Sequence, residues 1–208
     1  METTELAPKR GITETGLKWI ALVTMVLDHI HYFFGFTGVI PEWFSMAGRI
    51  SAPLFMFCLV EGFTHTHDRK KYFLKVYAIS AAMSLLYYLM AFGGLPVRPD
   101  GFFPANGMMT TFVILMVVWQ GIDWLGQKRL LSGLAAVLLP LAWPFAATLL
   151  VTVFPALSGL PGFVCYSVLP LWGMTGDSSW PVLVMGLVLY LFRKRRGVQV
   201  TAFTVYYL

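Results

Sequence analysis

The run LKWIALVTMVLDHIHYFFGF, from Leu17 to Phe36, decides the fold class of this chain. After Lys18 at its start, ionisable residues interrupt it only at Asp28, His29 and His31. A helix needs about 20 mostly apolar residues to cross the hydrocarbon core of a bilayer, and this run meets that length. It therefore predicts a membrane-spanning helix.

The composition extends this prediction to the whole chain. Of 208 residues, 58% are hydrophobic and only 12% are charged, whereas a soluble domain carries about a quarter of its residues charged. The length accommodates about six to eight spans with short loops. We therefore expect an all-α, polytopic helical bundle that forms a single transmembrane domain over residues 1–208. Rossmann, TIM-barrel and DNA-binding classes are excluded.

Further apolar runs and the basic loop between them set the expected topology. Three runs follow the first: Trp43 to Phe63, Phe73 to Phe92 and Met108 to Trp124. The loop Thr64 to Lys75 is the most basic in the first half, so we place it and the N-terminus in the cytoplasm. The net charge of +5 reflects such loops and predicts no nucleic-acid partner.

Prolines complicate the chain after Leu130. They are expected to break the apolar stretch into pieces. Protein groups or water must then satisfy the backbone groups that lose their hydrogen bonds at each break. The positive-inside rule favours one long span from Leu130 to Phe154, a re-entrant segment from Gly162 to Trp172, and a span from Trp180 to Phe192. The final run, Val198 to Leu208, is too short to cross, so we expect an incomplete last helix.

Asp28, His29 and Arg49 are the ionisable residues that stand out inside the first two runs. Insertion of such a side chain costs at least about 2.5 kcal/mol, so these residues are candidates for function. Antiparallel neighbouring spans would bring all three to a similar depth. Asp28 and Arg49 could then pair beside the imidazole, or they could form a buried ion pair that only fixes the packing of two helices.

Lys18 and His29 share a helix face, because they are eleven residues, or about three turns, apart. The rise between them is about 16 Å. A long ligand with a charged head could place its anion at Lys18 and its reactive end at His29. A lysine at a helix start also commonly extends toward the membrane surface.

A polar cluster follows the second run and contains Glu61, His65, His67, Arg69, Lys70 and Lys71. Glu61 and His65 are four residues apart and would face each other on a continuing helix. The basic side chains could hold phosphates, or they could set topology and touch anionic lipid headgroups. We expect no metal site here, because the His-x-His pair lacks an obvious third ligand.

The order of several short motifs resembles the TraX family. The segments that carry the resemblance are Leu17–Ala21, Met25–Ile30, Gly48–Phe55, Glu61–Phe63, His65–Thr66, Arg69–Tyr72, and Asn106 with Thr110. Lys18, ten intervening residues and His29 are also loosely similar to a motif of membrane acyltransferase family 3.

The TraX resemblance implies an inner-membrane N-acetyltransferase that transfers acetyl from acetyl-CoA to the N-terminal amine of a pilin. His29 would serve as general base, and Asp28 would hold Arg49, which donates to the oxyanion. A covalent acetyl-His intermediate is an alternative. Lys18, Arg69, Lys70 and Lys71 would bind the coenzyme phosphates, and Glu61 and His65 complete the expected coenzyme site.

Two other functions remain open from the sequence. A small transporter would also concentrate charges in its spans and break helices with proline, but it should show a repeat, which this sequence lacks. A non-catalytic pilus or fimbrial assembly factor would need the same membrane architecture without the histidine.

Overall fold

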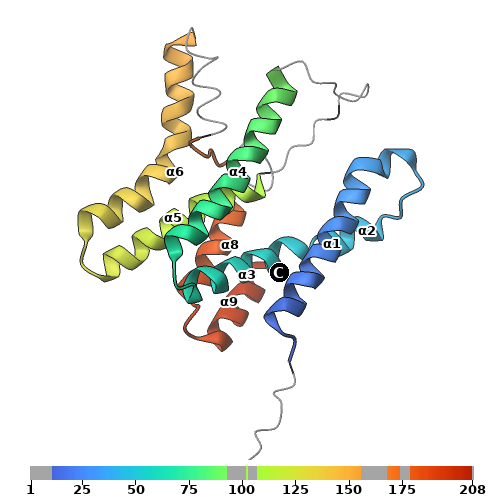
Figure 1. The fold of residues 1–208 in the computed structure, drawn as a ribbon, viewed down its shortest axis with the longest axis horizontal. Helices are drawn as coiled ribbons and strands as arrows, with labels where there is room; N and C mark the ends of the chain where they lie inside the picture. Colours follow the sequence, from blue (N-terminus) through green and yellow to red (C-terminus); the bar gives the residue numbers. More distant parts are fainter. Residues whose placement is uncertain (1–10, 93–101, 103–106, 156–167, 174–178, 208) are drawn as a thin grey trace, which may run out of the picture. The chain divides into compact units, whose positions relative to one another are not determined.

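A computed structural model describes residues 11–92, 102, 107–155, 168–173 and 179–207. All regular elements within these residues are helices (Figure 1). They divide into two compact units, one up to Cys58 and one from Leu59 onward, with the boundary inside helix α3. The all-α membrane class is confirmed. The single domain expected from the sequence stays a prediction.

Helix α1, Glu14–Phe34, is the main element of the first unit. Thr13 caps its start, because the Thr13 hydroxyl accepts a hydrogen bond from the Gly16 amide at 3.1 Å. The helix gives way at Gly35 to the short 3-10 helix η1, Gly35–Thr37. Gly38 follows with φ +71°, a left-handed conformation that turns the chain toward helix α2, Trp43–Gly48.

A helix break separates α2 from α3, Ser51–His65, at Arg49 and Ile50. Pro53 explains the break, because it has no amide to donate to the Arg49 carbonyl and its ring would clash with that carbonyl in a continuous helix. The Ser51 hydroxyl donates instead to the Gly48 carbonyl at 2.7 Å. The second apolar run thus forms two helices, and Trp43–His65 as a whole is long and apolar enough to cross a membrane, as predicted.

In the second unit, α5, Met108–Gly126, packs closely against α6, Leu130–Val153. Lys128 takes a left-handed φ of 63° in the tight turn between them. A Cβ on Gly121 would lie 3.0 Å from the Gly133 carbonyl oxygen, and the reverse distance is also 3.0 Å. The two backbones approach this closely only because both residues lack side chains.

Helix α6 runs without interruption through Pro140 and Pro144. The expectation that these prolines divide the stretch is wrong, and the long span from Leu130 is confirmed. Figure 1 shows the helix bending partway along its length. Trp172 supports this region, since its indole donates to the Leu141 carbonyl at 3.0 Å. This bond joins Trp172 to α6 beside Pro140. The carbonyls that lack an amide partner because of Pro140 and Pro144 are those of Ala136 and Pro140.

Five helical segments are long and apolar enough to cross a membrane in the part of the chain that the structure describes. They are Glu14–Thr37, Trp43–His65, Arg69–Met90, Met108–Gly126 and Leu130–Val153. The third lies within α4, Arg69–Phe92. Two shorter helices follow, α8, Trp180–Leu191, and α9, Arg196–Tyr207. Most of the expected re-entrant segment lies outside the described residues, so the total of six to eight spans stays a prediction.

Three aromatic rings form the core of the second unit. Trp119 of α5 stacks on Tyr190 of α8, with ring centres 4.8 Å apart and planes 8° from parallel. Phe63 of α3 lies 5.6 Å from Trp119 and 6.0 Å from Tyr190. Each ring is at least 98% buried, so this cluster fixes three helices to one another.

Gln199 joins α9 to the end of α8. Its side-chain amide donates to the Leu189 carbonyl at 2.7 Å, and its oxygen accepts from Arg196 at 2.9 Å. The Leu189 carbonyl is among the last four of α8, which have no partner within the helix. The buried Gln199 side chain thus gives this carbonyl at the end of α8 a hydrogen-bond donor.

Replacing Gln199 by Leu should lower the free energy of unfolding by about 1–3 kcal/mol, because a buried carbonyl loses its donor. Heat-induced unfolding of the detergent-solubilised protein measures the change. Thr204→Val on the same helix is the control, because the Thr204 hydroxyl is exposed and bonds only its own helix, to Val200. Equal losses in the two variants would contradict the role of Gln199.

Candidate functional site

His29 has a defined orientation on α1. Its Nδ1 lies 2.9 Å from the Met25 carbonyl oxygen. A carbonyl can only accept, so Nδ1 donates, and in the neutral ring Nε2 then carries the lone pair. The Phe33 ring, 6.2 Å away between centres, packs beside the imidazole one turn further on. His29 is therefore held in the tautomer in which Nε2 can accept a proton.

Asp28 packs against Gly48, the residue before Arg49. A Cβ on Gly48 would lie only 2.2 Å from the Asp28 Cβ, so α1 and α2 are in direct contact at this point. This agrees with the expectation that Asp28 and Arg49 lie at similar depth. The hydrogen bond of His29 goes to Met25, as expected for a side chain about 100° around the helix from Asp28. Arg49 is exposed and stands at the break between α2 and α3.

Lys18 lies near the start of α1, on the same continuous helix as His29. Its ammonium pairs with Glu14, one turn earlier, and both side chains are more than half exposed. An exposed pair of this kind contributes at most about 1 kcal/mol, so an anionic ligand could displace Glu14 at little cost.

The second unit holds the remaining candidates, and Glu61 lies at the centre of one group. The Glu61 carboxylate accepts a hydrogen bond from Arg196 of α9. This bond raises the pKa of the Arg196 guanidinium above its usual range, so the group stays charged. His65 Nδ1 lies 3.8 Å from the same carboxylate and 3.0 Å from the Glu61 carbonyl, which confirms that the two residues face each other.

Arg69 belongs to a partly buried ion cluster that the sequence analysis did not identify. Its guanidinium donates to Asp123 at 2.7 Å and to Gln120 at 3.3 Å. Arg193 donates to the other Asp123 oxygen at 2.8 Å, and the Tyr190 hydroxyl donates at 2.9 Å. We call Arg69, Asp123, Tyr190 and Arg193 the Asp123 cluster. One carboxylate thus ties together helices α4, α5 and α8 and the residue just beyond α8.

The Asp123 cluster covers the aromatic core. The Arg69 guanidinium lies 4.6 Å from the centre of the Phe63 ring, and that of Arg193 lies 3.7 Å from the Tyr190 ring. Cation–π attraction therefore adds to the ion pairs. Because its hydrogen bonds join α4 to α5, the Arg69 side chain has a structural role, and its assignment to the coenzyme stays a prediction.

A signal for this cluster was present in the sequence. Asp123 is the one acidic residue in the apolar run from Met108 to Trp124. The rule that singled out Asp28 and Arg49 applies equally to it. The basic run Arg193 to Arg196 follows the last predicted span, and Arg193 and Arg196 form the ion pairs described above.

Lys70 and Lys71 take no part in the ion pairs of the Asp123 cluster, and their surroundings differ. Lys71 is exposed, with its ammonium 3.6 Å from Asp68. Lys70 borders a cavity of about 490 Å³ that Arg69, Gln120 and Trp124 also line. Both lysines keep an exposed ammonium, whereas the Arg69 and Glu61 charges are already paired.

The predicted residues thus fall in two groups that the structure describes separately. Lys18, Asp28, His29 and Arg49 lie in the first unit, and the cluster from Glu61 to Lys71 lies in the second. Asn106, which contributed to the family resemblance, lies outside the described residues.

Comparison with known proteins tests the family resemblance. No curated protein and no solved structure matches the chain. The resemblance to membrane acyltransferase family 3 stays a prediction. The family model described as TraX protein matches residues 13–207, nearly the whole chain. On this match, and with the all-helical membrane fold described above, the chain belongs to the TraX family.

Proposed function

We propose that this protein is a membrane-embedded N-acetyltransferase that moves an acetyl group from acetyl-CoA to an acceptor amine, the N-terminus of a pilin. Membership of the TraX family supports the coarser role, the processing of conjugative pilins. The observation that carries the chemistry is the fixed His29 tautomer, because the Nδ1 bond to Met25 leaves Nε2 able to accept a proton.

The reaction needs one proton acceptor and stabilisation of one oxyanion. An α-amino group has a pKa of about 7.7–8, so a large share is protonated near neutral pH. The neutral share of the amine attacks the thioester carbon through its lone pair, and His29 Nε2 takes the proton that the nitrogen loses as the C–N bond forms. The C–S bond then breaks, and the imidazolium returns the proton to the leaving thiolate. The products are the acetylated amine and free coenzyme A.

Arg49 is the proposed donor to the oxyanion. It stands at a helix break and is exposed, and a guanidinium is a suitable donor to an oxyanion. Asp28 sets the position of the neighbouring Gly48 and so supports Arg49 through the backbone. An acetyl-His29 intermediate would use the same nitrogen as nucleophile.

Exposed cations provide for the coenzyme phosphates. In the first unit, Lys18 lies on the same helix face as His29, at a rise of about 16 Å. In the second unit, His65, Lys70 and Lys71 are the exposed members of the predicted cluster. Glu61 and Arg69 act as positioning residues through Arg196 and Asp123. The protein is placed in the inner membrane with its N-terminus in the cytoplasm, where acetyl-CoA is available.

Intact-mass analysis of pilin, from cells with and without this protein, tests the proposal. Wild type should add one acetyl group to the pilin N-terminus. His29→Asn keeps a side-chain donor for the Met25 carbonyl but has no second ring nitrogen. We expect it to lower the rate about 10²–10⁴-fold, the usual contribution of a general base.

His31→Asn is the matched control on the same helix, because His31 packs against Gly35 and has no role in the proposed reaction. It should acetylate pilin at the wild-type rate. Acetylation by His29→Asn at the wild-type rate would remove His29 from the mechanism. If inserted wild-type protein leaves the mass of pilin unchanged, pilin is not the acceptor, and a non-catalytic assembly factor becomes the better reading.

A further inference from the structure

Two cavities adjoin between helices α4, α5 and α6 of the second unit. The first has a volume of about 490 Å³ and is bordered by Arg69 and Lys70. The second has a volume of about 550 Å³ and includes Tyr77 in its wall. Phe73 and Val117 line both, so the two spaces meet at these side chains. We call them the basic cavity and the apolar cavity.

The cavities follow one another along the helices from a charged end to an apolar end. On α4 the wall runs from Lys70 in the basic cavity to Tyr77 in the apolar cavity, a rise of about 10 Å. On the antiparallel α5 it runs from Trp124 to Val113 in the same direction. The charged end is the start of α4, which the positive-inside rule places at the cytoplasmic surface. This order matches a lipid of the cytoplasmic leaflet, with its headgroup at the surface and its chains deeper.

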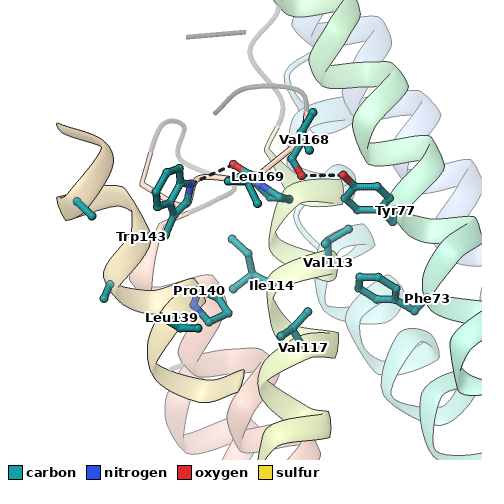
Figure 2. A pocket seen from close by; sticks show the side chains of 13 residues that line it. Phe73, Tyr77, Val113, Ile114, Val117, Leu139, Pro140, Trp143, Val168 and Leu169 are labelled. Atoms are coloured by element: carbon teal, nitrogen blue, oxygen red, sulfur yellow. Dashed lines mark hydrogen bonds between the residues drawn. The ribbon is translucent and has the colours of Figure 1, made fainter. Parts of the chain in front are cut away.

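The apolar cavity offers little to a polar ligand. Its two polar side-chain groups are already engaged, as Figure 2 shows: the Tyr77 hydroxyl donates to the Val168 carbonyl at 2.7 Å, and the Trp143 indole donates to the Leu169 carbonyl at 3.3 Å. The rest of the wall is apolar. A pantetheine arm would bury its amides there without hydrogen-bond partners, whereas a hydrocarbon chain has no polar groups that need them.

The basic cavity supplies a cation for a phosphate. Lys70 borders this cavity, its side chain is exposed, and it forms no ion pair with any residue that the structure describes. Arg69 beside it is held by Asp123 and shares that carboxylate with Arg193. Two guanidinium groups on one carboxylate leave a positive charge in excess. The charge at this end therefore complements an anionic headgroup.

We propose that the two cavities together bind one anionic glycerophospholipid of the cytoplasmic leaflet. Its phosphate lies at Lys70, and one acyl chain passes between Phe73 and Val117 into the apolar cavity. This proposal uses residues of the second unit alone and does not involve His29. On this proposal Lys70 binds the lipid phosphate and not the coenzyme, and Lys18 and Lys71 stay assigned to the coenzyme phosphates.

Native mass spectrometry of delipidated full-length protein, titrated with dioleoylphosphatidylglycerol in detergent, tests this site. Wild type should bind one molecule per chain. Ala142 lines the apolar cavity and is exposed, so Ala142→Phe fills the space without removing a core contact. It should weaken binding at least about tenfold, because several methylene groups of the acyl chain can no longer be buried in the cavity. Ala135→Phe, exposed on the same helix outside both cavities, should bind as wild type.

The headgroup is tested in the same way. Lys70→Gln should weaken binding about fivefold, the usual effect of one lysine near an anionic surface, while Lys75→Gln should not. Dioleoylphosphatidylcholine should bind more weakly than the anionic lipid by a similar factor. Equal binding of the two lipids, or of Ala142→Phe and Ala135→Phe, overturns the proposal. Displacement of the bound lipid by added acetyl-CoA also overturns it, because the cavity would then belong to the coenzyme.

Discussion

Asp123→Asn should lower the free energy of unfolding by about 3–5 kcal/mol, the usual cost of removing one partner from a buried ion pair. The Asp123 side chain is 16% exposed, and that of Arg193 is 15% exposed. Without the carboxylate, two guanidinium groups face each other with no negative charge between them. The helices that Asp123 ties together should separate at a lower temperature. Loss of tryptophan-monitored structure on heating the purified protein measures the effect.

Asp68→Asn is the matched control for this variant. Asp68 pairs with Lys71 at 3.6 Å, but the side chains are 41% and 81% exposed. Such pairs contribute about 0–1 kcal/mol. Adding Arg193→Leu to Asp123→Asn should cost less than the sum of the two single changes, because the second change removes a charge that the first left unpaired. A strictly additive result, or equal effects at Asp123 and Asp68, would show that the cluster does not stabilise the fold.

Gly48→Ala should destabilise the first unit by about 1–3 kcal/mol and reduce acetyl transfer as well. The new Cβ would lie 2.2 Å from the Asp28 Cβ and 2.4 Å from its Cγ. A Cβ moves only with its backbone, so α1 and α2 must separate. His29 is the neighbour of Asp28, and its position should shift with the helix.

Gly197→Ala in α9 is the control, because an added Cβ there meets no atom within 4 Å. It should leave stability unchanged or raise it by about 0.5–1 kcal/mol, since alanine favours helix over glycine. Asp28→Gly removes the atom that the new methyl group would meet, so it should recover part of the stability that Gly48→Ala loses. Unchanged unfolding of Gly48→Ala, or no recovery in the double variant, would show that α1 and α2 do not pack closely here.

The long apolar runs by themselves determined the fold class and most helix positions. Met108 to Trp124 and Leu130 to Phe154 were predicted to within two residues of α5 and α6. Such segments must satisfy their backbone hydrogen bonds internally, which leaves the helix as the one structure open to them. The motif order likewise led to the family that the comparison shows. Local composition was sufficient for each of these conclusions.

The effects of proline depended on the tertiary structure. Pro53 accompanies a helix break, whereas α6 continues through Pro140 and Pro144. The sequence contains the same missing amide in each case. The outcome depends on the neighbouring groups that pack against the helix, such as the Trp172 indole, which donates to the Leu141 carbonyl. Such groups come from distant positions in the chain, so a local pattern does not reveal them.

The candidate residues show the same contrast between what a local sequence pattern predicts and what only tertiary packing decides. The sequence identified His29 as an ionisable group inside a span, but the tautomer followed only from its distance to Met25. It also predicted that Glu61 faces His65, because residues four apart on one helix are neighbours whatever the tertiary fold. It did not show that Asp123 holds Arg69 and Arg193, which are separated from it by 54 and 70 positions. Helix periodicity fixes neighbours within one turn, whereas partners on different helices are fixed only when those helices pack.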